Sequence, residues 1–176
     1  HRARLLFAAR SGEPWPDWSI EGLLEKLDSW LSAYLGDATG QADLDQLNLH
    51  TLLRASLPWP EGAELDVLAP PFLELPTGRH ADISYLNEDG EAVPMVRIRV
   101  QDGVGLDLHP TIARLPVVFE LLSPADRPIH ITSDLPGFWR GSWSEVRKDL
   151  AGRYPKHRWP ERPHEAKPGR LGKNED

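Results

Sequence analysis

The class of fold follows from one alternating run near the middle of the chain, Val96-Arg97-Ile98-Arg99-Val100-Gln101. Apolar side chains alternate there with polar ones, as in a strand that buries a single face. Strand-like sequence recurs at 81–86, 115–121 and 128–132, and residues 123–127 have the composition of a hairpin loop. Because the connections are too short for crossover helices, we expect these strands to pair antiparallel in a small sheet.

The segment before the strands has the periodicity of helices. Residues 18–36 and 43–57 carry apolar side chains three and four positions apart, and residues 1–10 and 61–68 predict two further helices. Asp17 or Ser19 is placed to cap the helix over 18–36, and Gly36 is placed to end it with a left-handed backbone.

A last helix is predicted after the strands. Ser142 and Glu145 have the spacing of a capping box, and Trp143, Val146 and Leu150 follow at helical spacing. Gly152 is the predicted stop.

Together these segments predict an α+β fold, with N-terminal helices packed on a small, mainly antiparallel sheet, followed by a C-terminal helix and a basic, proline-rich tail. We expect one domain over residues 1–162. It comprises a helical lead-in (1–68), a β-rich part (69–133) and a helix with a basic extension (134–162). Residues 163–176 are charged and proline-rich, which predicts a disordered tail.

Composition narrows the classes of function. The 176 residues include no Cys, so disulfides, Cys-ligated zinc and thiol nucleophiles are excluded. The longest apolar run is five residues (5–9), so no membrane span is predicted. The lack of Cys fits a reducing compartment, and we expect the protein to be cytoplasmic. A first residue of His1 rather than Met suggests a piece of a longer protein.

Charge is divided unevenly along the chain. The net charge is −7, but residues 1–137 carry a net −11 and residues 138–176 a net +4. A basic segment on an acidic body is either an electrostatic footprint for an anionic partner or simply a solvated tail.

No motif for catalysis or for a metal site is complete. The sequence lacks a phosphate-binding loop, a dinucleotide fingerprint, a Gly-x-Ser-x-Gly elbow and a His-Glu-x-x-His pair. His80 and Asp82 share one strand face, where a polar surface pair is favoured over a weak metal site. Glu120 either points outward by alternation or sits in an apolar strand as a carboxylate of raised pKa. His130 is predicted to face solvent. We therefore predict neither catalytic residues nor metal ligands.

Candidate nucleic-acid-binding residues concentrate in the basic segment, where cations and aromatic rings are interleaved. The cations are Arg140, Arg147, Lys148, Arg153, Lys156 and Arg158. Trp139 and Trp159 are candidates for stacking on bases, with burial in the core as the alternative, and Trp143 is favoured as core. Arg97 and Arg99 on one strand face are further candidates, with salt bridges to the acidic body as the alternative.

Several runs of this sequence resemble the C-terminal region of HrpB-type bacterial ATP-dependent helicases, which are DEAH-like proteins of superfamily 2. The resemblance is carried by Leu75-Pro76-Thr77-Gly78-Arg79, by the run at 96–101, by Leu121 to Pro128, by Gly137-Phe138-Trp139-Arg140-Gly141-Ser142-Trp143, by Glu145 to Lys148, and by Gly152-Arg153-Tyr154-Pro155-Lys156-His157. The sequence departs from the family pattern at Gln101-Asp102-Gly103-Val104-Gly105.

The resemblance implies that this region is not an independent enzyme. ATP and magnesium would belong to upstream motor domains, so no cofactor is expected in this chain. We expect an accessory domain of an RNA helicase that helps to bind or position single-stranded RNA or DNA. The alternative is a docking module that packs on the upstream helicase core or recruits another protein. A stand-alone hydrolase built on Glu120 and a second acid is the third hypothesis.

Overall fold

The computed structural model describes residues 1–10, 14–36, 39–57 and 59–167. The chain divides into two compact units, His1–Ala69 and Pro70–Asp176. This division falls next to the end of the predicted helical lead-in at residue 68. Each unit has its own core and is described by itself.

The N-terminal unit consists of short helices in its described part. They are α1 (Arg2–Ala9), α2 (Ile20–Glu25), α3 (Leu27–Trp30), α4 (Ser32–Leu35), α5 (Gln41–Asp45), α6 (Leu49–Ala55) and α7 (Glu61–Leu68). Its buried apolar side chains include Leu5, Leu6, Trp15 and Leu65. Arg2 joins α1 to α7, because its Nε donates to the carbonyl of Ala69 at 2.6 Å.

The two long helices of the lead-in are predicted wrongly. Residues 18–36 form three short helices rather than one, and residues 43–57 form α6 with α5 just before it. Ile20, Leu24, Leu27 and Tyr34 of this range are exposed, and helices with little packing are marginal. The predicted ends are nevertheless confirmed: the Ser19 hydroxyl accepts from the Gly22 N–H at 3.0 Å, and Gly36 has a φ of 37°.

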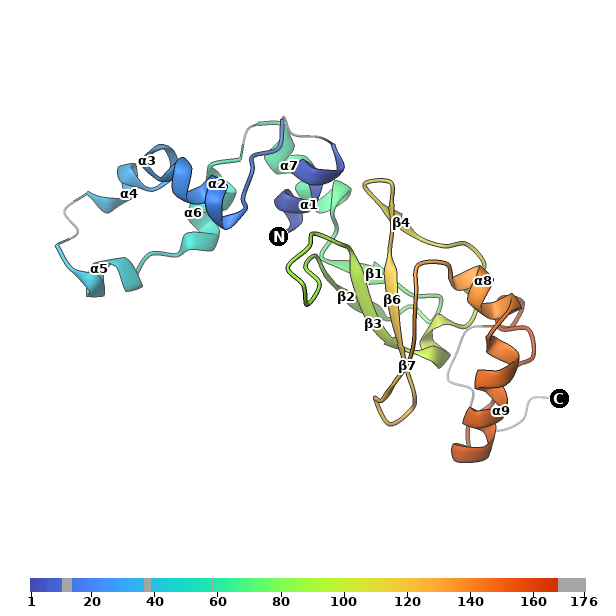
Figure 1. The fold of residues 1–176 in the computed structure, drawn as a ribbon. Helices are drawn as coiled ribbons and strands as arrows, with labels where there is room; N and C mark the ends of the chain where they lie inside the picture. Colours follow the sequence, from blue (N-terminus) through green and yellow to red (C-terminus); the bar gives the residue numbers. More distant parts are fainter. Residues whose placement is uncertain (11–13, 37–38, 58, 168–176) are drawn as a thin grey trace. The chain divides into compact units, whose positions relative to one another are not determined.

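A five-stranded sheet forms the centre of the C-terminal unit (Figure 1). Its strands are β1 (Phe72–Glu74), β2 (His80–Ser84), β3 (Met95–Arg99), β6 (Val118–Leu122) and β7 (Pro128–Thr132), in the order β1-β2-β3-β6-β7. The hairpin loop at 123–127 is confirmed, since β6 and β7 pair antiparallel.

The central pair of this sheet departs from the expected topology. Strands β3 and β6 are parallel, with Val96 opposite Phe119 and Ile98 opposite Leu121. The chain between them includes a 3-10 helix, η1 (Val100–Gly103), and the hairpin of β4 (Thr111–Ile112) and β5 (Leu115–Pro116). This connection is long enough to return the chain to the same end of the sheet, so this one pair is the exception within the predicted, mainly antiparallel sheet.

Two helices, α8 (Leu135–Arg140) and α9 (Trp143–Arg153), follow the sheet. Asp134 caps α8, because its carboxylate accepts from the Gly137 N–H at 2.9 Å. The predicted capping box before α9 is wrong: the Ser142 side chain makes no cap hydrogen bond and its backbone is already helical. Helix α9 continues past Gly152, which is therefore not its stop.

One face of the sheet is buried beneath aromatic side chains. Val96, Ile98, Phe119 and Leu121 are buried there. His130 stacks on Phe138 of α8 with ring centroids 4.7 Å apart. The prediction that His130 faces solvent is therefore wrong. Its partner across the ladder is the buried Leu121, and paired residues share a face.

The segment after α9 lies against the unit rather than free of it. Trp159 and Pro163 are buried, and the Gly105 N–H donates to the carbonyl of Pro163 at 2.9 Å. Residues 163–167 are the described part of the tail predicted to be disordered, and residues 168–176 lie outside the described part. The predicted α+β class, with a mainly antiparallel sheet and a C-terminal helix, is confirmed. Within the described residues, no helix combines the length and the apolar character needed to cross a membrane.

Candidate nucleic-acid interface

Two of the six cations of the basic segment that are predicted to bind nucleic acid form ion pairs. Arg147 on α9 contacts the Glu161 carboxylate at 2.9 Å and the carbonyl of Trp159 at 3.4 Å. Arg153 contacts Asp149 one turn earlier at 3.0 Å. The half-buried Arg147 therefore holds the chain after α9 in place, and its charge is not available to an incoming anion.

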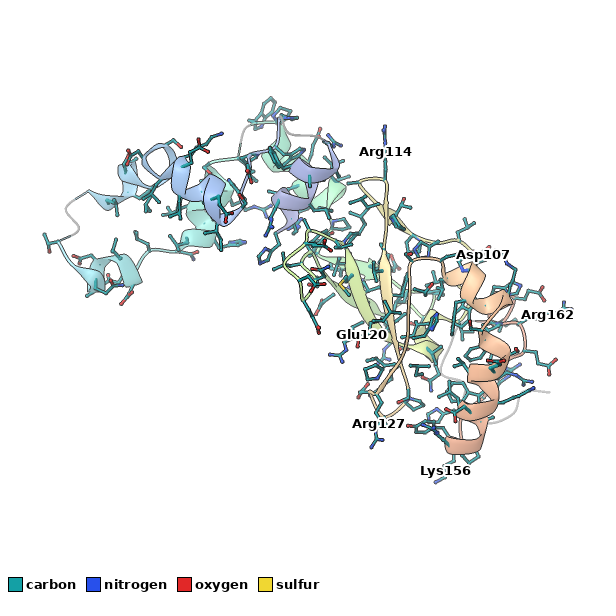
Figure 2. The ribbon with its side chains drawn as sticks, viewed as in Figure 1. Asp107, Arg114, Glu120, Arg127, Lys156 and Arg162 are labelled. Carbon is teal, nitrogen blue, oxygen red and sulfur yellow. The ribbon has the colours of Figure 1, made fainter. Side chains whose placement is uncertain are left out.

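The other four predicted cations are exposed and pair with no described carboxylate. Arg140 ends α8, Lys148 lies on α9, and Lys156 and Arg158 follow it. Figure 2 shows Lys156 beyond the end of α9, with its side chain directed away from the unit. Cations without a local counter-ion retain their full charge for an anionic partner.

The backbone that carries Lys156 and Arg158 is anchored at several points. The Trp159 Nε1 donates to the carbonyl of Tyr154 at 3.1 Å, and the Trp143 Nε1 donates to the carbonyl of Pro160 at 2.9 Å. His157, between the two cations, contacts the Gln101 amide at 3.1 Å. The segment up to Pro160 is therefore not a freely solvated tail, and its cations are presented from a fixed loop.

For Trp139 and Trp159, the alternative of burial in the core is the one found. Their exposed fractions are 4% and 8%, and the Trp139 Nε1 donates to the carbonyl of Leu106 at 3.1 Å. Trp139 meets Trp143 edge to face at 5.3 Å, and Trp143 lies 6.3 Å from Trp159. These rings are the core between the two helices and the chain after them, so no ring face is left for a base.

The two predicted strand arginines are exposed but neutralised. Arg97 contacts Glu120 at 3.1 Å, and Arg99 makes two hydrogen bonds of 2.8 Å to the Asp126 carboxylate. These hydrogen bonds lower the pKa of Asp126 below its usual range. The alternative of salt bridges to the acidic body is therefore the one found. Glu120 points to the same face as Arg97, as alternation predicts.

Arg97, together with Arg99 and Asp126, lines an open groove of about 530 Å³ on the face of the sheet opposite the aromatic core. A third pair, Arg79 with Asp102 at 3.3 Å, lies in the same groove, together with Asp82. Because carboxylates balance the arginines there, the groove has no excess positive charge with which to attract a nucleic-acid strand.

Arg127 and Arg114 are among the exposed cations of the C-terminal unit that sequence reasoning missed. Arg127 lies in the β6–β7 loop and lines a smaller pocket of about 380 Å³ against α9. Arg114 lies at the tip of the β4–β5 hairpin (Figure 2). Both were overlooked because they lie outside the basic segment, although turn positions are common sites for functional side chains.

The described residues bring no three His, Asp or Glu side chains together in a way that could hold a metal ion. His80 instead stacks on Phe72, with ring centroids 4.0 Å apart. The two pockets described above are therefore lined by side chains of both charges, and their described residues do not form a set of metal ligands.

The family model HrpB_C, described as ATP-dependent helicase C-terminal, matches residues 30–163. The chain belongs to this family. The resemblance that the sequence motifs indicate is thereby confirmed. The chain is also 40% identical over 176 residues to the ATP-dependent RNA helicase HrpB of Escherichia coli strain K12, covering 98% of this chain and 21% of that protein.

Solved structures agree with this assignment. The crystal structure of the E. coli DExH-box NTPase HrpB matches with a TM-score of 0.83 and 39% identity, over 96% of this chain and 21% of that one. A crystal structure of the E. coli DEAH/RHA helicase HrpB matches with a TM-score of 0.66 and 39% identity, over 90% and 20% of the two chains. The chain thus spans about a fifth of the length of the relatives it matches.

Proposed function

We propose that this chain is an accessory region of an ATP-dependent helicase and that it contacts the phosphates of a single-stranded nucleic acid through Arg140, Lys148, Lys156 and Arg158. The observation that carries the proposal is the exposure of these four cations without a described carboxylate partner. ATP and magnesium would be bound by motor domains elsewhere in such a helicase.

The expected mode of binding is contact with phosphate groups rather than stacking on bases. With Trp139 and Trp159 buried, the two rings predicted to stack on bases are not available, and the four cations offer charge. Phosphate contacts carry no sequence information and position the strand instead. The region would therefore hold a strand with little base preference, in a manner strongly dependent on salt.

The test measures the affinity of the chain for a labelled oligouridylate of about a dozen nucleotides at about 50 and 200 mM salt. Four phosphate contacts to a single strand predict a slope of log K against log salt of roughly −3, which is a loss of roughly 50-fold over this range. Replacing all four cations by Gln should remove most of the affinity and most of the slope.

A control that removes two positive charges from the other unit separates this site from a general effect of net charge, and it is compared with Lys156→Gln with Arg158→Gln, which also removes two. Lys26→Gln with Arg10→Gln changes exposed cations of the N-terminal unit and should leave the affinity nearly unchanged. Absence of binding at the lower salt concentration would refute the proposal, as would a quadruple variant that binds like the unaltered chain.

A second candidate function, docking on the remainder of the helicase, is favoured by the apolar surface of the N-terminal unit. Ile20, Leu24 and Leu27 follow one another at helical spacing and are 73%, 63% and 37% exposed. Other large apolar side chains of this unit are also exposed: Tyr34, Leu44, Leu49, Trp59 and Val67. Exposed apolar surface of this extent marks an interaction site, and about four fifths of each matched relative lies outside the matched region.

This candidate is tested by capturing the E. coli HrpB protein without its last fifth on the immobilised chain. Ile20→Asp with Leu24→Asp should abolish capture, whereas Ser84→Asp, at an exposed position of the other unit, should not. Equal capture by both variants would exclude docking through this surface, and self-association of the unaltered chain would point to a second copy as the occupant instead.

A further inference from the structure

The hairpin of β4 and β5 turns through two residues that are poorly suited to their backbone. Ile112 pairs with Leu115, so Ala113 and Arg114 alone form the turn. Their φ values are 50° and 69°, both left-handed. A two-residue turn with two positive φ values strongly prefers Asn-Gly or a related pair, because a Cβ crowds the backbone in this region.

Elsewhere in the described chain, left-handed backbone falls on residues that tolerate it. These are Gly36, Gly78, Gly90, Gly105 and Asp126. Asp is among the residues that most readily adopt positive φ, and Arg99 holds the Asp126 carboxylate. Ala113 has no polar side chain to stabilise such a conformation, so the turn contradicts its local sequence preference.

The base of the hairpin holds this turn in place. Ile112 is 6% exposed and Val117 fully buried. The Val117 N–H donates to the carbonyl of Pro110 at 3.0 Å. His109 Nδ1 accepts from the Leu135 N–H at 3.0 Å, which leaves Nε2 to donate to the carbonyl of Val117 at 2.9 Å. Strain maintained by surrounding contacts is typical of positions with a functional role.

The turn presents the guanidinium of Arg114 to solvent. Arg114 is exposed and pairs with no described carboxylate. Figure 2 shows its side chain at the hairpin tip, pointing away from the strands and at the opposite end of the C-terminal unit from Lys156. A Gly at this position would relieve the backbone but would remove the cation.

We infer that the β4–β5 hairpin places Arg114 as an additional phosphate contact for the single-stranded nucleic acid. This inference rests on the proposed function and extends it to a second end of the same unit. The guanidinium fork matches a phosphate group with two hydrogen bonds. A protein partner is less favoured, since the neighbouring Thr111 and Pro116 are exposed and form no apolar surround for an arginine anchor.

The test compares stability and binding in one set of variants. Ala113→Asn with Arg114→Gly supplies the preferred turn, so the thermal midpoint should rise by about 5 °C while the affinity for the oligouridylate falls roughly fivefold at low salt. The salt slope should become shallower by about 0.7, the value for one phosphate contact on a single strand. Ala113→Asn alone keeps the guanidinium and should retain the affinity.

Arg114→Ala provides the second, independent readout, because it should lose the same affinity without the gain in thermal midpoint. Unchanged RNA affinity in both Arg114 variants would overturn the inference while leaving the four cations of the basic segment in place. Unchanged RNA affinity together with weaker capture of truncated E. coli HrpB would also overturn it, by identifying a protein carboxylate as the partner. If Ala113→Asn with Arg114→Gly were no more stable than the unaltered chain, the turn would not be strained, and this would overturn the inference that the fold holds Arg114 there against its backbone preference.

Discussion

The two units of the chain differ most in the exposed fractions of their large apolar side chains. In the N-terminal unit, Ile20, Trp59 and Val67 are 73%, 86% and 79% exposed. Trp15 of the same unit is buried and only 1% exposed. In the C-terminal unit, Trp143 and Trp159 are 1% and 8% exposed. A sheet offers a broad face on which helices can pack, whereas short helices cover one another poorly. The described helices of the N-terminal unit therefore leave several large apolar side chains exposed.

The largest expected difference between the units lies in their tryptophans. Trp143→Ala removes a ring that packs edge to face on Trp139 and on Phe138, so we expect a loss of about 3–5 kcal/mol in the free energy of unfolding. Trp59→Ala changes a side chain that is 86% exposed and should stay within about 0.5 kcal/mol. Urea denaturation followed by circular dichroism measures both. Similar losses for the two variants would mean that the N-terminal unit buries Trp59 in solution.

Sequence patterns predicted the class of fold because strand alternation and helical periodicity are local. The run at 96–101 is the strand β3 followed by η1, and the segments at 1–10 and 61–68 are α1 and α7. The parallel pairing of β3 with β6 was not predictable in the same way. It depends on the path of residues 100–117, whose two short strands and 3-10 turn give only weak sequence signals.

The candidate site was predictable only as a set of residue types. Which cations remain available depends on partners that are distant in sequence, such as Glu161 for Arg147 and Asp126 for Arg99. The four-residue spacing of Trp139 and Trp143 suits a core stripe on one helix but does not show whether a single helix carries both rings. The structure resolves this, because α8 and α9 are separate helices whose rings meet in one cluster.

Helix caps give a smaller and sharper comparison of the two units. Ser19→Ala removes the hydroxyl that accepts from the Gly22 N–H, so the N-terminal unit should lose about 1 kcal/mol. Ser142→Ala in the C-terminal unit removes no cap hydrogen bond and should change stability by less than about 0.5 kcal/mol. Urea denaturation of the two variants distinguishes them. If Ser142→Ala lost as much stability as Ser19→Ala, the Ser142 side chain would cap α9 in solution, as the sequence predicts.

The smallest expected effect is on how the free energy of unfolding of the N-terminal unit depends on pH, to which Asp66 contributes. Its carboxylate on α7 accepts hydrogen bonds from Arg2 of α1 and from Arg54 of α6, and these lower the pKa of Asp66 below the ordinary 3.8. The folded state then binds fewer protons than the unfolded state, so this contribution is present above about pH 4 and is lost as the pH falls further.

Asp66→Asn should therefore cost the N-terminal unit less than about 1 kcal/mol at pH 7, as exposed ion pairs do, and the cost should vanish toward pH 2. Asp126→Asn provides the matched change in the C-terminal unit, where Arg99 likewise lowers the pKa of the carboxyl group. Urea midpoints of both variants across this pH range make the measurement. If Asp66→Asn left the acid dependence of the N-terminal unit unaltered, the ion pairs of Asp66 would contribute nothing to the join between α1, α6 and α7. The hydrogen bond from Arg2 to the carbonyl of Ala69 and the buried side chains of Leu5, Leu6 and Leu65 would then hold α1 against α7.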